Sequence, residues 1–309
     1  MEGRRVRSFS EYDPAVTAVY FAAVMGLAMF SNSPAITLLS LCGALLYFFS
    51  LNGTSGGRFH LFAFLLFIIL AAVNPLVSHN GTTVLLVVND RPITLEALIY
   101  GLCSSVLITG TLYWLRCFTQ IMTTDKLLRV TGFLSPKLSL VLSMAVRFVP
   151  LFGRQWQKIN NAQRAMGLYR EDNAIDGARG SLRVFSVLVT WALENGITTA
   201  DSMEARGCGV SRRTSFHKFR LRHGDYILLA AELILFAGAA SAAAAGAFDF
   251  SCYPSVTMAE RDWRTYTGAA AYGLLVLLPV IIDMEARIRW SLLKPTGLAL
   301  SIPERKNMP

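Results

Sequence analysis

Long apolar runs separated by short polar segments are the dominant pattern along this chain. Each run reaches or approaches the roughly 20 residues that a helix needs to cross the hydrocarbon core of a bilayer. Six runs fit this description, at residues 15–30, 35–51, 59–77, 95–118, 226–247 and 268–284. The pattern predicts an all-α integral membrane protein with about six transmembrane helices.

The first run is short for a span and could be read as a signal peptide. No small-residue cleavage site follows it, and a second apolar run begins within a few residues, after a turn marked by Pro34. We therefore expect residues 15–30 to remain as the first span.

The central segment, residues 119–225, has a different pattern. Its apolar residues recur every three or four positions, which is typical of amphipathic helices. We expect three helices: one opening at Ser135-Pro136 and kinked or ended at Pro150, one over 151–166, and one from near Ser181 to Arg206. Residues 177–180 (Gly-Ala-Arg-Gly) are expected to form a linker loop.

These patterns divide the chain into three regions. Residues 1–118 hold four spans, residues 119–225 form a three-helix cytoplasmic module, and residues 226–309 hold two spans and a tail.

Charge then predicts the orientation. The composition is 53% hydrophobic, mean hydropathy is +0.45 and net charge is +9, most of it in the central segment. Under the positive-inside rule, the basic loops and both termini are cytoplasmic. The loops at 74–94 and 248–267 have nearly balanced charge and are expected outside as hairpins or short loops. The flanking cations that set this orientation are Arg4, Arg5, Arg7, Arg58, Arg287, Arg289 and Lys294.

Two helices of the central segment end in similar phrases. One is Ala165-Met166-Gly167, with Arg164 just before it, and the other is Ala205-Arg206-Gly207. Glycine suits the left-handed position after a helix, and a cation in the last turn is favoured by the helix dipole. Ordinary helices also end in this way, so a purely structural role stays open for either phrase taken alone.

Taken in order, these phrases resemble the transmembrane T component of energy-coupling factor transporters, which are ATP-driven importers of vitamins and transition-metal ions. Supporting phrases are Arg147-Phe148-Val149-Pro150 and the run from Thr190 to Asn195. The family has two Ala-Arg-Gly signatures, whereas here Met166 stands in the first arginine position. Arg164 lies about 200° away around the helix and does not simply replace it.

The resemblance implies a non-catalytic subunit of the bacterial or archaeal cell membrane. Two ABC ATPase subunits would each receive one helix end, and a substrate-binding S component would be moved in response. ATP would be used by the ATPases, and no cofactor is expected on this chain. The residues implied in ATPase coupling are Arg164, Ala165, Met166, Gly167, Ala205, Arg206 and Gly207. Those implied to face the S component are Leu142, Val149, Leu151, Phe185 and Val189.

Purely structural roles and other functions remain as alternatives to an energy-coupling subunit. The apolar stripes of the module, such as Leu182, Phe185 and Val189, could simply pack on one another and on the underside of the spans. A self-contained secondary transporter or an integral membrane enzyme is an alternative, although no repeat and no convergent catalytic set is visible. No Walker loop and no metal-ligand spacing occurs, and the basic charge suits membrane lipid better than nucleic acid. Glu232, inside a span, is expected to hydrogen-bond within the bundle, with a proton or ion path as the alternative.

Overall fold

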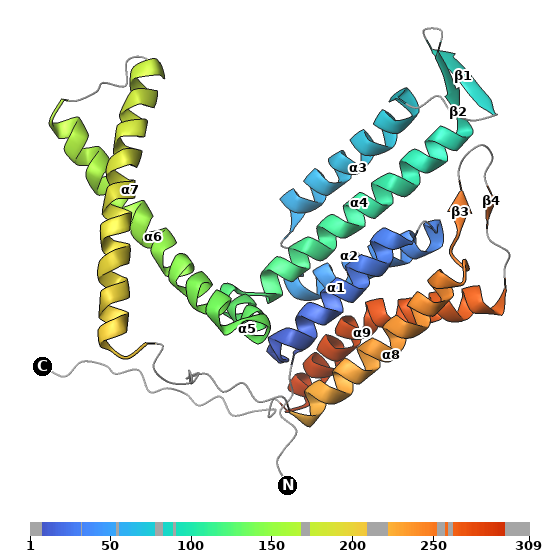
Figure 1. Cartoon of the computed structure of the whole chain (residues 1–309). Helices are drawn as coiled ribbons and strands as arrows, with labels where there is room; N and C mark the ends of the chain where they lie inside the picture. Colours follow the sequence, from blue (N-terminus) through green and yellow to red (C-terminus); the bar gives the residue numbers. More distant parts are fainter. Residues whose placement is uncertain are drawn as a thin grey trace, which may run out of the picture. The chain divides into compact units, whose positions relative to one another are not determined.

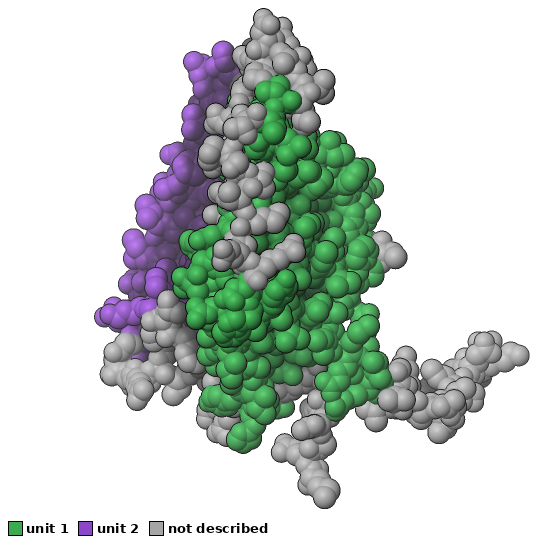
Figure 2. All heavy atoms as spheres, turned by 90° about the vertical axis from the view of Figure 1, so that its right-hand side faces the viewer, with its two compact units in different colours: residues 1–126, 221–309 green, residues 127–220 purple. Residues whose placement is uncertain are grey.

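The computed structural model describes residues 8–31, 33–53, 56–77, 83–88, 91–167, 174–208, 222–251, 257–258 and 262–293. The chain divides into two compact units (Figure 1; Figure 2). Unit 1 comprises residues 1–126 and 221–309, and unit 2 comprises residues 127–220. Arg4, Arg5, Arg7 and Lys294, which entered the orientation argument, lie outside the described residues.

Unit 1 is a bundle of long helices preceded by a short 3-10 turn, η1 (Phe9–Glu11). Helices α2 and α3 pack on α4, α8 packs on α9, and α1 and α2 join the two groups (Figure 1). The bundle helices are α1 (Pro14–Phe30), α2 (Pro34–Asn52), α3 (Gly57–Val77), α4 (Leu95–Ile121), α8 (His223–Ala244) and α9 (Trp263–Leu293). Pro14 and Pro34 each stand in the first turn, where the missing proline N–H costs nothing.

Large aromatic side chains fill the centre of this bundle. Trp114 of α4 is fully buried, and its indole N–H donates to Ser40 Oγ at 3.0 Å. Its ring meets Tyr20 of α1 edge to face at 6.1 Å between centroids. Tyr20 and Tyr272 donate to backbone carbonyls of neighbouring helices, so their hydroxyls are satisfied within the apolar core.

Five of the six predicted spans are confirmed as helices long and apolar enough to cross a membrane: α2, α3, α4, α8 and α9. The remaining one corresponds to α1, which at 17 residues is a shorter apolar helix. The prediction of an all-α membrane protein is therefore confirmed.

The segments expected outside the membrane contain two small hairpins. Strand β1 (Val84–Val88) pairs antiparallel with β2 (Arg91–Thr94), and β3 (Phe250–Ser251) pairs with β4 (Thr257–Met258). The predicted loop limits were too wide, because α3 continues through Pro75 to Val77 and α9 begins at Trp263. Both helices therefore extend into segments where turn-forming residues had suggested loops.

Polar contacts hold the chain at the end of the bundle where α1 begins. The Phe9 amide donates to Asp283 Oδ1 at 2.8 Å, which ties η1 to α9. Lys126 Nζ donates to the carbonyls of Ser10 at 2.6 Å and Ile121 at 2.9 Å. Burial lowers the pKa of Lys126 because its charged form loses hydration.

Glu232 lies in α8 with only 1% of its surface exposed. Neither carboxylate oxygen has a hydrogen-bond partner among the described residues. The expected hydrogen bond within the bundle is thus absent from the described part of the chain. The proton or ion path stays a prediction for this side chain.

Unit 2 consists mainly of α6 (Pro136–Ala165) and α7 (Ala174–Ala205), preceded by α5 (Thr124–Leu134), which begins at the end of unit 1. The sequence did not predict α5, and the two helices predicted over 135–166 are one helix. The prediction that a helix could end at Pro150 was therefore wrong. Aromatic stacking across this turn, with Phe148 and Phe152 centroids 5.6 Å apart, supports the backbone where Pro150 removes one hydrogen bond.

The expected linker at 177–180 is also wrong, because these residues belong to the first turns of α7. Arg179 pairs with Asp176 one turn earlier at 3.9 Å, and Ser181 Oγ donates to the Gly177 carbonyl at 2.9 Å. The exposed ion pair contributes only a few tenths of a kcal/mol, which is less than the helix-propensity cost of the two glycines. The helix nevertheless starts seven residues before Ser181, the predicted opening.

Candidate functional site at two helix ends

The end of α7 is closed by a complete glycine cap. Gly207 has φ +77°, a left-handed conformation that glycine adopts without steric cost. Its N–H donates to the Glu204 carbonyl at 2.8 Å, and the Cys208 N–H donates to the Met203 carbonyl at 3.0 Å. These two bonds form a Schellman motif, in which the residue before the glycine is the helix cap. That cap residue is Arg206.

The end of α6 shares the left-handed glycine and the first of these two bonds. Gly167 has φ +68°, and its N–H donates to the Arg164 carbonyl at 3.0 Å. Met166 stands at the cap with φ −77° and ψ −2°, and its own N–H donates to the Ala162 carbonyl. Both glycine caps agree with the sequence prediction, since the structure has positive φ at each of these positions.

Met166 and Arg206 therefore occupy equivalent places in two equivalent helix ends. Both are exposed, with 64% of the Met166 surface accessible. The adjacent Ala165 and Ala205 close each helix with small exposed side chains. Arg164 contributes its carbonyl to the first cap, two residues before Met166, and is not at the position of the family's arginine.

The two ends lie toward opposite ends of α7 within unit 2 (Figure 1). Helix α7 has 32 residues, so it is about 48 Å long at ~1.5 Å per residue. Only residues 168–173 separate the Gly167 cap from the start of α7, while Gly207 follows its last turn. One chain thus presents two similar tips at well-separated points.

A small core holds α6 and α7 together. Val184 is fully buried and Gln163 is 4% exposed. Phe152 of α6 meets Trp191 of α7 edge to face, with ring centroids 6.0 Å apart. Trp191 belongs to a phrase that the sequence had marked as a family feature, and its position at this crossing gives it a packing role.

Much of the apolar surface of unit 2 faces away from this core. Four of the residues predicted to face the S component are exposed: Leu142, Val149, Phe185 and Val189, at 37%, 69%, 55% and 41%. The fifth, Leu151, is half-buried. Leu182 is also exposed, at 68%, so the α6–α7 core does not cover these side chains, and their packing on the underside of the spans stays a prediction. The periodicity of the sequence predicted that α6 and α7 carry apolar stripes, but it did not predict which apolar residues are buried between the two helices.

No group of three or more His, Cys, Asp or Glu side chains within the described ranges is arranged to hold a metal ion. The described residues instead form a bundle of membrane-length helices, interrupted along the chain by the long helices α6 and α7, whose C-terminal caps and apolar faces are exposed. This combination defines a multi-pass helical membrane protein with an amphipathic two-helix unit.

Comparison with protein families gives the class a name. The family described as "Cobalt transport protein", CbiQ, matches residues 5–216, which is more than half of the chain. The chain belongs to the CbiQ family. That description is of a transport protein and not of an enzyme.

Individual relatives agree with this assignment. The chain is 33% identical over 103 residues to the energy-coupling factor transporter transmembrane protein EcfT 1 of Listeria monocytogenes, a stretch covering 33% of this chain and 39% of the relative. It is 34% identical over 112 residues to the corresponding EcfT protein of Lacticaseibacillus paracasei, covering 36% of this chain and 42% of the relative. The chain thus spans about two fifths of the length of the curated relatives it matches.

Proposed function

We propose that this chain is the transmembrane coupling subunit of an energy-coupling factor importer. In this role it transmits ATP-driven movements of two ATPase subunits to a separate substrate-binding S component. Vitamins and transition-metal ions are the substrate classes, and ATP is used by the partners. The observation that carries the proposal is the pair of equivalent, exposed, glycine-capped helix ends.

Two separated tips suit a pair of ATPase subunits. The Gly167 and Gly207 caps fix the direction in which Met166 and Arg206 leave their helices. A rigidly presented side chain loses less conformational entropy on binding than one on a loose loop. Each tip can therefore act as a handle that moves with the ATPase to which it binds.

The chemistry of the two tips differs. The Arg206 guanidinium can bind a groove carboxylate with two parallel hydrogen bonds and keeps its charge when partly buried. No carboxylate among the described residues pairs with it, so it is available for a partner. Met166 would instead fill an apolar groove, for which its flexible thioether is well suited. We expect the two ATPase grooves to differ accordingly, or one groove to accept both side chains.

The exposed apolar face of unit 2 supports the second half of the proposal. Leu142, Val149, Phe185 and Val189 expose apolar surface that a soluble monomer would normally cover. We assign this face, together with Leu151, to the S component. Movement of α6 and α7 would then change the position of the bound S component directly.

Orientation follows from charge. The end of the bundle that holds Arg58, Arg116 and Arg287 would face the cytoplasm, and the β1–β2 and β3–β4 hairpins would face outside. Both termini would then be cytoplasmic, and the module at 119–225 would lie on the side where ATP is available.

Co-expression with candidate ATPase and S-component partners tests the proposal. Purification through a tag on this chain should recover an ATPase pair, and Arg206→Ala should reduce that recovery. Recovery of the chain alone, in both forms, together with transport activity of the purified chain, would favour a self-contained transporter instead.

A further inference from the structure

A pocket of about 640 Å³ opens at one end of the unit 1 bundle, where α2 ends, α3 begins and α4 ends. This volume is within the roughly 300–1,000 Å³ typical of small-molecule sites. The pocket belongs to none of the features assigned above to coupling. Its lining residues are Phe48, Asn52, Gly56, Gly57, Arg58, Phe59, Arg116 and Gln120.

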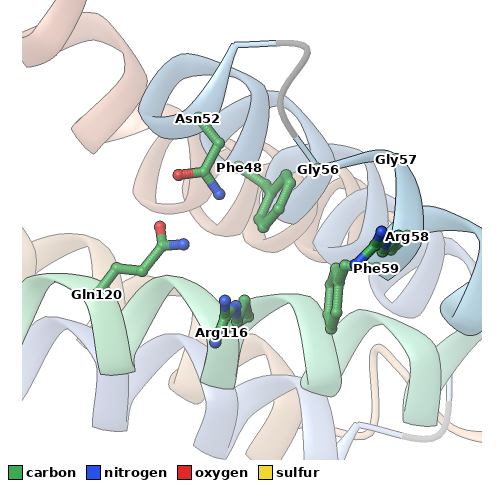
Figure 3. Close-up of a pocket in the computed structure, with 8 residues that line it drawn as sticks. All are labelled: Phe48, Asn52, Gly56, Gly57, Arg58, Phe59, Arg116 and Gln120. Carbon is green, nitrogen blue, oxygen red and sulfur yellow. The ribbon is translucent and has the colours of Figure 1, made fainter.

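The polar lining of this pocket is cationic and hydrogen-bonding. Arg58 and Arg116 supply two positive charges, and Asn52 and Gln120 supply amides that point toward one another across the pocket (Figure 3). None of its described lining residues is acidic, and no described carboxylate pairs with either guanidinium. An uncompensated pair of arginines in a concave site favours an anion, and a phosphate matches the guanidinium geometry well.

The other wall is aromatic. The Phe48 and Phe59 rings stack with centroids 5.5 Å apart, and the Arg116 guanidinium lies 5.9 Å from the Phe59 centroid. This contact holds the guanidinium beside the apolar wall. Gly56 is required here, because a Cβ at that position would lie 2.7 Å from the Phe48 ring. The pocket therefore joins an anion-binding side to an apolar side.

The pocket lies where the membrane-spanning helices end. Asn52 is the last residue of α2, Gly57 is the first of α3, and Gln120 is in the last turn of α4. A ligand here would have its polar part at the bilayer boundary and could extend an apolar part along the exposed faces of the spans. The side chains next along α3, Leu61 and Phe62, are 71% and 57% exposed.

We propose that this pocket binds the phosphate headgroup of an anionic phospholipid. The arginines and amides hold the phosphate, and the phenylalanine wall receives the glycerol and the start of an acyl chain. Basic pockets between spans are recognised sites for anionic headgroups. The site does not depend on the coupling role and would stand if that role failed.

The test is lipid titration of the full-length chain, purified in detergent, followed by native mass spectrometry. Phosphatidylglycerol should bind with a higher affinity than phosphatidylcholine. Arg116→Gln should weaken phosphatidylglycerol binding about tenfold or more, the usual effect of losing hydrogen bonds to a charged group. Arg116→Lys, which keeps the charge but not the planar fork, should give a smaller loss.

Arg289→Gln is the matched control, because it removes one positive charge from the same end of the bundle outside the pocket. It should change affinity by no more than about fivefold, the general contribution of one basic residue near a membrane surface. Equal losses in the Arg116 and Arg289 variants would overturn the site in favour of a diffuse charge effect. Gln120→Leu leaves all charges in place and should still weaken binding, with folding of each variant checked by gel filtration.

A soluble ligand is distinguished by competition with glycerol phosphate. It should displace phosphatidylglycerol weakly, because it lacks the acyl chains that contact the aromatic wall and the spans. Displacement at concentrations similar to the lipid, lost in Arg116→Gln, would overturn the lipid assignment and make a free phosphate compound the ligand.

Discussion

Replacing Arg206 with alanine is the sharpest test of the coupling role. The α7 cap is made by backbone groups: the Gly207 and Cys208 N–H groups bind carbonyls of Glu204 and Met203. The substitution leaves these bonds in place. In the isolated chain it removes only the favourable interaction of the cation with the helix dipole, about 0.3–1 kcal/mol. Helix α7 should therefore keep its length and its end.

The loss on binding should be larger. A desolvated arginine at an interface is a typical hot spot, and we expect Arg206→Ala to cost about 2 kcal/mol or more of ATPase binding. Since ~1.4 kcal/mol corresponds to tenfold, the dissociation constant should rise by about thirtyfold. Arg206→Lys should recover only part of this, because the ammonium keeps the charge but not the bidentate geometry.

The assay is titration of purified ATPase subunits onto the tagged chain in detergent, with binding followed by fluorescence anisotropy. Arg179→Ala is the control: it removes an exposed arginine from the same helix, at the opposite end, where it pairs with Asp176. Circular dichroism establishes that helix content is unchanged. A dissociation constant within twofold of wild type for Arg206→Ala, or an equal loss for Arg179→Ala, would refute the assignment of Arg206.

Three further predictions follow from the same structure. Gly207→Ala should destabilise the α7 cap by about 1–2 kcal/mol, because alanine at φ +77° is strained, and should weaken ATPase binding; unchanged binding would count against a role for the cap. Met166→Ala should weaken ATPase binding by about 1.5 kcal/mol through lost apolar burial, measured in the same titration; an unchanged affinity would show that the α6 tip stays outside the groove. Gly43→Ala should lower the free energy of unfolding of the bundle by about 1–3 kcal/mol, and with it the melting temperature, because the new Cβ would lie 1.8 Å from Val276 Cγ1. Gly26→Ala, where a Cβ meets nothing within 4 Å, is its control, and equal melting temperatures of the two variants would contradict the close packing of α2 on α9.

The helix ends illustrate what local sequence can predict. Glycine at positions 167 and 207 follows amphipathic runs, and both positions have the left-handed conformation expected of helix-terminating glycines. The positions of the spans could also be predicted, because the length of an apolar run along the sequence can be compared directly with the thickness of the bilayer core.

Helix continuity was harder to predict. Pro150 and the glycines at 177 and 180 signalled breaks, yet α6 and α7 run through them. Helix propensity gives only the local cost of such residues. Contacts of the folded chain, such as the ring stacking between Phe148 and Phe152 and the packing of Phe152 on Trp191, are not part of that cost.

The sequence by itself determined the membrane class, the spans, the amphipathic module and the two glycine-capped ends, because each depends on neighbours within a few turns. Only the tertiary structure decided which apolar stripe is exposed, how Asp283 holds the Phe9 amide, and that Arg58 and Arg116 line one pocket. These contacts join residues tens to hundreds of positions apart. Their partners are set by the packing of whole helices, which periodicity along the chain does not specify.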